Sequence, residues 1–265
     1  MRSCLIMGSG RSGTSMLGGI FYQAGYFMGD GLYKGNQSNP KGFFENSLVN
    51  NTNELILSFY NKKILPYYFY KLLRISKPNP KKRQQWLCSI PQCTDISFFN
   101  TNVKSNILSL TKKSPFCYKD PRFSYTLPVW FPYLPSETRL LCVFRRPNVT
   151  VESILNECMA SSYLKSLFIN SDYAYNVYIN IYRHIFKNMV GSEEKFFFAH
   201  YDQIISGQII ASLSEFVQAS LSSAFADPTL YRTHSSRPIP QKAMEVYTVL
   251  CNLAGFSDPL INEVL

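Results

Sequence analysis

An octapeptide near the N-terminus combines glycines, hydroxyl groups and one cation in a pattern that can bind phosphate. The residues from Gly8 to Ser15 read GSGRSGTS. They follow a short apolar run at residues 4–7 and precede an apolar-periodic stretch, which is the order strand, loop, helix. Glycines let backbone N–H groups converge on an anion, and the N-terminus of the helix adds its dipole. We therefore expect a phosphate-binding loop here.

The loop differs from the ATP-binding P-loop at one position. The pattern G-x-x-x-x-G-K-[ST] requires Lys directly after its second Gly. Gly8 and Gly13 have the right spacing, but the next residue is Thr14, and the cation lies inside the loop at Arg11. Such a loop is poorly suited to a β/γ-phosphate with magnesium, yet it can hold one phosphate. The residues expected to do so are Gly10, Arg11, Ser12, Gly13, Thr14 and Ser15.

A second pair of phosphate-binding groups follows another apolar run. The strand expected at residues 140–144 is followed by Arg145. Pro147 suits the first position of a helix, which we expect over residues 148–159. Ser153 lies on that helix, eight residues after Arg145. A guanidinium fork and a hydroxyl could hold a phosphate together, whereas the alternative is a surface arginine beside an ordinary helix serine.

The two motifs together resemble the sulfotransferases that use 3′-phosphoadenosine 5′-phosphosulfate (PAPS). In that family the 5′-phosphosulfate loop reads [KR]-S-G-T-[ST], which residues 11–15 match. The family's 3′-phosphate motif is an Arg at a strand end and a Ser eight residues later, as at Arg145 and Ser153. The resemblance implies an enzyme that moves a sulfuryl group from PAPS to a hydroxyl acceptor and leaves PAP (adenosine 3′,5′-bisphosphate). A glycan, a lipid-linked sugar, a peptide or a small alcohol would all fit as the acceptor.

A third charged strand end lies between the two phosphate motifs. Residues 116–119 end at Lys119, where the family carries Lys-x-x-Leu-Pro or Lys-x-Pro. The resemblance implies that Lys119 contacts the transferring sulfuryl group and stabilises its charge together with Arg11. The alternative is a local ion cluster of Lys119, Asp120 and Arg122, which is common at strand ends.

The resemblance leaves two candidates for the catalytic base. Many cytosolic members place a His two residues after the strand-end Lys, where this chain has Pro121. Glycan and tyrosine sulfotransferases use a Glu after the first helix instead. Residues 39–45 read NPKGFFE and match the N-P-x-G-[FY]-[FY]-E segment of bacterial sulfotransferases. Glu45 is therefore the first choice and Asp120 the second, and the alternative for Glu45 is a helix-capping carboxylate.

Apolar runs and helical periodicity alternate along the chain. This order predicts an α/β fold in which a parallel sheet is flanked by helices, as in P-loop NTPases. Strands are expected at 4–7, 116–119, 140–144 and 195–199, and helices at 15–23, 47–60, 148–159, 172–189, 209–221 and 242–254. Both phosphate motifs would then lie at the carboxyl ends of strands, where such sheets bind ligands. At 265 residues the chain is most easily one domain. The resemblance, which covers residues 4 to about 221, implies that this single domain over residues 1–265 is a sulfotransferase domain.

The composition indicates the cellular compartment of the protein and bears on whether it binds a metal. No run of 18 apolar residues is present, and residues 4–7 are too short for a signal peptide. The seven cysteines are scattered without metal-ligand spacing. We therefore expect a cytoplasmic protein that has no metal site.

The net charge of +10 is concentrated in one segment. Between residues 55 and 94 there are eight basic residues and no acidic residue, with aromatic residues interleaved. An insertion at about 61–94 that faces an anionic or membrane-associated acceptor would explain this pattern, and so would a plain structural insertion. We expect no nucleic-acid partner.

Two other classes of function stay open. One is a P-loop kinase for a nucleotide or small molecule, against which the missing Lys at position 14 argues. The other is a basic anion-binding module without catalysis, which would not need Arg145 and Ser153.

Overall fold

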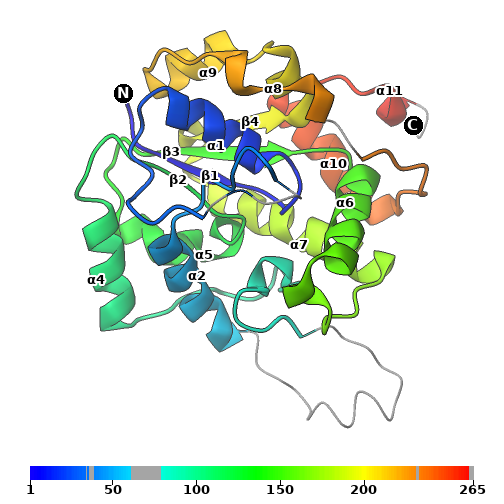
Figure 1. The fold of residues 1–265 in the computed structure, drawn as a ribbon, viewed down its shortest axis with the longest axis horizontal. Coiled ribbons are helices and arrows are strands. Elements are labelled where there is room, and N and C mark those ends of the chain that lie inside the picture. The colour runs from blue at the N-terminus through cyan, green and yellow to red at the C-terminus, as the bar shows by residue number, and fades with distance from the viewer. Residues whose placement is uncertain (34, 36–38, 61–78, 231–232, 263–265) are drawn as a thin grey trace.

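A parallel β-sheet forms the centre of the molecule. The computed structural model describes residues 1–33, 35, 39–60, 79–230 and 233–262. Within this part of the chain four parallel strands pair in the order β2-β1-β3-β4 (Figure 1). The strands are β1 (Cys4–Met7), β2 (Cys117–Lys119), β3 (Arg139–Phe144) and β4 (Phe196–His200). The expected α/β class with a helix-flanked parallel sheet is confirmed.

Helices cover both faces of this sheet (Figure 1). Their bounds are α1 (Thr14–Gln23), α2 (Ser47–Tyr60), α4 (Thr101–Leu110), α5 (Phe123–Trp130), α6 (Pro147–Ala160), α7 (Ser171–Met189), α8 (Tyr201–Ser206), α9 (Ile210–Val217), α10 (Gln241–Ala254) and α11 (Pro259–Asn262). Side chains alternate along each strand. Cys4 and Ile6 therefore join the apolar cluster under α1 and α9, whereas Leu5 and Met7 join the larger cluster with α5 and α7.

The predicted strands and helices are present, with bounds that shift by a few residues. One helix is shorter than expected: the helix predicted at 209–221 ends at Val217, because Gln218 adopts a left-handed φ of 52°. Four helices of the described chain, α4, α5, α8 and α11, were not predicted. Helix α5 contains Pro128, which cannot donate to the carbonyl of Ser124. Asn188 of α7 donates its side-chain amide to that carbonyl at 3.4 Å, so a distant residue compensates for the proline.

The basic insertion is described only from residue 79 onward; residues 61–78 lie outside the described part of the chain. Its described part contains a short 3-10 helix at Gln85–Leu87. In the described residues we find no helix with the length and apolar character needed to cross a membrane.

Candidate active site

The carboxyl ends of the four strands open into one cavity of about 480 Å³. The loop after β1, Lys119 at the end of β2, Arg145 after β3 and Tyr201 after β4 all line it. Helices α2 and α6 and the segment around Trp86 complete its walls. The parallel topology therefore gathers the separate sequence motifs at one edge of the sheet.

The phosphate-binding loop depends on two glycines. Gly8 has φ 136°, and a Cβ there would lie 2.1 Å from the carbonyl oxygen of Val143. Gly13 has φ 100°, and a Cβ there would lie 2.4 Å from the ring of Tyr201. The loop consequently packs directly against β3 and against the start of α8.

The N-terminus of α1 offers free donors to the cavity. The amides of Gly13, Thr14 and Ser15 donate no hydrogen bond within the described residues, and neither does the Thr14 hydroxyl. All three residues line the cavity. Open amides at a helix N-terminus, next to the positive end of its dipole, are suited to an anion.

Ser12 does not contribute in the expected way. Its side chain is fully buried, and its hydroxyl lies 2.6 Å from the carbonyl oxygen of Ser9 and 3.1 Å from that of Val143. It is not among the residues that line the cavity. This corrects the expectation that the Ser12 hydroxyl faces a phosphate: the hydroxyl shapes the loop and ties it to β3.

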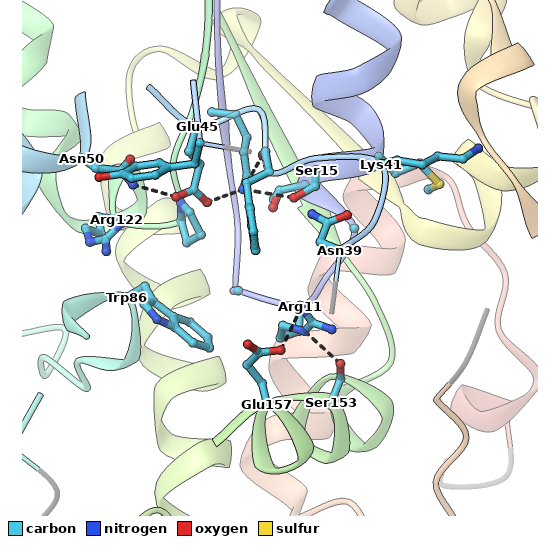
Figure 2. Close-up of a pocket in the computed structure, with 18 of the residues that line it drawn as sticks. Arg11, Ser15, Asn39, Lys41, Glu45, Asn50, Trp86, Arg122, Ser153 and Glu157 are labelled. Atoms are coloured by element: carbon cyan, nitrogen blue, oxygen red, sulfur yellow. Dashed lines mark hydrogen bonds and ion pairs between the residues drawn. The ribbon is translucent and has the colours of Figure 1, made fainter. Parts of the chain in front are cut away.

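Arg11 reaches from the loop to helix α6. Its Nε donates to Ser153 Oγ at 3.1 Å, and its Nη1 lies 3.4 Å from Glu157 Oε2 (Figure 2). Sequence reasoning had not singled out Glu157. The signal for it was its position four residues after Ser153, which places both on one face of the helix.

Arg145 lies on the same side of the cavity. Its guanidinium carbon lies 4.3 Å from the centre of the Tyr201 ring, and its Nη2 donates to the carbonyl oxygen of Thr233 at 3.4 Å. Arg145 and Ser153 both line the cavity, as the spacing of the second motif predicts. The structure therefore brings the two predicted phosphate motifs to one cavity.

Lys119 and Glu45 meet on the opposite wall. The Lys119 ammonium donates to Ser15 Oγ at 3.2 Å and to the carbonyl oxygen of Phe43 at 3.2 Å, and it forms an ion pair with Glu45 Oε1. The other Glu45 oxygen accepts a hydrogen bond of 2.7 Å from Asn50 Nδ2. Two residues separated by 74 positions in sequence thus form an ion pair between the buried Lys119 and the half-buried Glu45.

The environment of Glu45 keeps it ionised. Burial by itself would raise the pKa of this carboxyl group. The positive charges of Lys119 and Arg122, with the hydrogen bonds from Lys119 and Asn50, outweigh burial and hold the pKa below its ordinary value. Glu45 is therefore a carboxylate at neutral pH and can accept a proton.

The helix-capping alternative for Glu45 does not hold. The side-chain oxygen of Asn46 accepts from the amides of Leu48 and Val49, at 2.9 and 3.1 Å, and thereby caps α2. The carboxylate of Glu45 points to Lys119 and Asn50 instead.

Asp120 lies beside the cavity and does not line it. It is fully buried, and its carboxylate accepts from Arg122 Nη1 at 2.9 Å and from Asn53 Nδ2 at 3.0 Å. Arg122 also binds Glu54 through its Nε at 2.7 Å. The expected ion cluster at this strand end exists, but Lys119 pairs with Glu45. The second choice for the base is consequently occupied inside a buried cluster.

Two solved structures show the same architecture. The sulfotransferase domain of the Synechococcus PCC 7002 olefin synthase matches with a TM-score of 0.51 at 12% identity, over 98% of this chain and 96% of that domain. The sulfotransferase domain of the curacin biosynthetic pathway matches with a TM-score of 0.50 at 13% identity, over 98% and 99%. This chain has the sulfotransferase fold. No protein-family model and no curated protein matches the sequence.

Within this sulfotransferase fold, the segment around Trp86 adds a wall that the motifs had not predicted. The indole ring packs against the phosphate-binding loop so closely that a Cβ at Gly10 would lie 2.3 Å from it. Glu54, Arg83 and Tyr163 border the cavity near this wall. The feature of the sequence that could have indicated this wall is the aromatic and basic character of the insertion, which contains Arg83 and Trp86.

At the other end of the cavity, Lys41 connects two segments that are distant in the sequence. Lys41 donates to the carbonyl oxygen of Phe225 at 3.0 Å and pairs with Asp227 at 3.2 Å. It holds the segment that carries Glu45 against a loop 180 residues later in the sequence. Phe44 and Phe225 meet edge to face beneath it, at 5.3 Å between ring centres.

Proposed function

We propose that this chain is a sulfotransferase that uses PAPS and transfers its sulfuryl group to a hydroxyl acceptor. One observation carries the proposal: the residues of the two predicted phosphate motifs and the Lys119–Glu45 pair line the same cavity. A donor that carries phosphate groups at both ends of a nucleoside needs two such sites. The sulfotransferase fold supports the proposal at the level of architecture.

The residues around the cavity fit such a donor. The open amides of residues 13–15 and the hydroxyl of Thr14 would hold its 5′-phosphosulfate, with Arg11 alongside. Arg145 and Ser153 would hold its 3′-phosphate. When bound, the donor supplies the sulfuryl group.

The roles of the other residues follow from charge and position. Glu45 accepts the proton of the acceptor hydroxyl, as a general base does. Lys119 and Arg11 stabilise the negative charge that develops on the transferring group and on the leaving phosphate. Fixed charges in a buried cavity need no reorganisation during the reaction, which makes them effective.

The ion pair between Lys119 and Glu45 links these roles. If Lys119 turns toward a bound donor, Glu45 loses its strongest stabilising charge. Burial then raises the pKa of Glu45, which makes it a better proton acceptor. The same lysine would thus couple donor binding to activation of the base.

Ligand-induced thermal stabilisation tests the proposal before any acceptor is known. PAP should raise the melting temperature more than AMP or Mg-ATP at equal concentration. A ligand at 100 times its dissociation constant adds about 2.7 kcal/mol to the free energy of unfolding. Equal increases in melting temperature with AMP and PAP would show that the chain has no 3′-phosphate site. Stabilisation by Mg-ATP alone would indicate a kinase, and stabilisation by an oligonucleotide alone would indicate a binding module.

A further inference from the structure

Arg83 differs from the other arginines that line the cavity. Arg11 binds Ser153 and Glu157, Arg122 is buried between Glu54 and Asp120, and Arg145 lies on Tyr201. The guanidinium of Arg83 forms no hydrogen bond or ion pair within the described residues, although Arg83 borders the cavity and is exposed. Its donors are therefore available to a ligand.

The backbone of Arg83 is held in a strained conformation. Its φ of 72° lies in the left-handed region, which is uncommon for a residue other than glycine. Its amide donates to Glu54 Oε2 at 2.8 Å. The next residue, Gln84, is buried and binds the amide of Lys81 at 2.9 Å and the carbonyl oxygen of Tyr163 at 2.5 Å. Strain of this kind persists where the surroundings determine the conformation, and it often marks functional sites.

Helix α2 sets the position of Arg83 relative to the proposed base. Asn50 binds Glu45 and Glu54 binds the amide of Arg83. Four residues separate Asn50 and Glu54, which is about 6 Å along the helix axis. Helix α2 therefore holds both Glu45 and Arg83, through side chains that lie about one turn apart on the helix.

The neighbouring carboxylates do not compete for this guanidinium. Glu45 is paired with Lys119, and the oxygens of Glu54 and Asp120 are taken by Arg122, Asn53 and the Arg83 amide. An incoming ligand would therefore meet a cation and the half-buried indole of Trp86 on this wall.

We propose that Arg83 binds an anionic group of the acceptor, so that the acceptor is a hydroxyl compound that also carries a carboxylate or an ester phosphate. A guanidinium presents two parallel N–H donors that match the two oxygens of such a group. The ring of Trp86 would contact the apolar part that connects the anion to the reacting hydroxyl. That the bound molecule is a sulfuryl acceptor rests on the proposed function. That Arg83 binds an anion does not.

A matched pair of probes tests the site by binding alone. The probes are 4-(hydroxymethyl)benzoate and its methyl ester, which differ by one charge; 4-(hydroxymethyl)phenyl phosphate distinguishes a phosphate from a carboxylate. The chain has two tryptophans, of which Trp130 is fully buried and Trp86 lines the cavity. Quenching or enhancement of tryptophan fluorescence therefore reports binding beside Trp86, and Trp86→Phe checks that assignment.

The anionic probes should bind about tenfold more tightly than the ester, as expected for a charge-assisted contact. Arg83→Gln should abolish this preference without changing ester binding, and Arg83→Lys should keep part of it. Lys82→Gln is the matched control, because Lys82 is exposed and does not line the cavity. Arg83→Gly suits the left-handed φ and removes the guanidinium, so it replaces Arg83→Gln if that variant unfolds.

Two results would overturn the inference. The first is equal binding of the acid, the phosphate and the ester. The second is an equal loss of preference in Lys82→Gln and Arg83→Gln, which would indicate general surface charge. Sulfuryl transfer from PAPS is assayed separately. If the anionic probes bind through Arg83 but no transfer occurs, only the proposed function is contradicted. If neutral and anionic alcohols accept the sulfuryl group equally well, only this inference is contradicted.

Discussion

Arg11 Nε lies 3.1 Å from Ser153 Oγ, across 142 positions of sequence. The arginine belongs to the loop after β1 and the serine to helix α6, so this bond joins the two proposed phosphate sites. The Arg11 guanidinium also pairs with Glu157 Oε2 at 3.4 Å, so it already contacts two groups of helix α6. A donor that spans both proposed sites would have to replace this bond with its own contacts to Arg11 and Ser153.

The 3′-phosphate site can be tested through Arg145. Arg145→Ala should weaken PAP binding by about 1.5–3 kcal/mol, because a charged bidentate contact is lost. AMP lacks the 3′-phosphate, so its affinity should hardly change. Isothermal titration calorimetry measures both. Arg237→Ala is the control: Arg237 pairs with Glu152 at 2.9 Å and does not line the cavity. If PAP affinity is unchanged in Arg145→Ala, Arg145 does not bind the 3′-phosphate and the site must lie elsewhere.

Replacement of the proposed base should separate chemistry from binding. Glu45→Gln keeps the shape of the side chain but cannot accept a proton, so turnover should fall by about 10²–10⁴-fold. PAP affinity should stay similar, because the donor contacts come from other residues. Steady-state kinetics with PAPS and calorimetry with PAP give the two quantities. A fully active Glu45→Gln enzyme would exclude Glu45 as the base.

Asp120 should matter for stability more than for the reaction. Asp120→Asn leaves Arg122 buried with Glu54 as its remaining partner, and breaking a buried ion pair costs about 3–5 kcal/mol. Urea unfolding measures this loss. A stable Asp120→Asn protein that binds PAP but does not turn over would make Asp120 the base.

The pH dependence of activity should reveal the link between Lys119 and Glu45. In the free enzyme the pKa of Glu45 is below its ordinary value of about 4.3. The acidic limb of kcat/KM for PAPS, which reports the enzyme without donor, should therefore lie below that ordinary value. In Lys119→Met the lowering charge and hydrogen bond are gone while burial remains. The pKa should then rise, and the limb of the residual activity should move to higher pH.

Two comparisons make the Lys119 result specific. The infrared carbonyl band of a protonated carboxyl group should appear at higher pH in Lys119→Met than in the wild type. Lys187→Met, which removes an exposed partner of Asp95, should leave both readouts unchanged. An acidic limb that stays in place in Lys119→Met would break the proposed coupling.

His200 predicts a pH dependence of stability. This histidine is fully buried between Tyr247 and Phe256, and burial lowers its pKa to about 3. The unfolded chain binds the proton near pH 6.5 and the folded chain does not. Stability is therefore complete above pH 6.5 and is lost as pH falls toward 3, by at most about 1.4 kcal/mol per pH unit.

The comparison with His200→Gln isolates that contribution. The pKa of the buried His184 is lowered as well, so the wild type and the variant share its effect. Urea unfolding between pH 4 and 8 should give a shallower loss in His200→Gln. Parallel curves for the two proteins would show that His200 is not the group that titrates.

The sequence by itself determined the strand, loop and helix that carry each motif, because these features are local. The glycine spacing and the apolar runs predicted the phosphate-binding loop, the strand before Arg145 and the helix that bears Ser153. Helix α5 was missed for the opposite reason. Pro128 argues against a helix, and the bond that compensates for it comes from Asn188, sixty residues later.

Only the tertiary structure decided which charged groups meet. Nothing in the sequence shows that Lys119 pairs with Glu45 and not with its neighbour Asp120, or that the Ser12 hydroxyl turns toward β3. Which charged side chains form ion pairs depends on how the parallel strands align their carboxyl ends. It also depends on which carboxylate oxygens are buried and can no longer bind water. Arg83 enters the cavity wall through the bond from its amide to Glu54 on helix α2, a contact that no local pattern encodes.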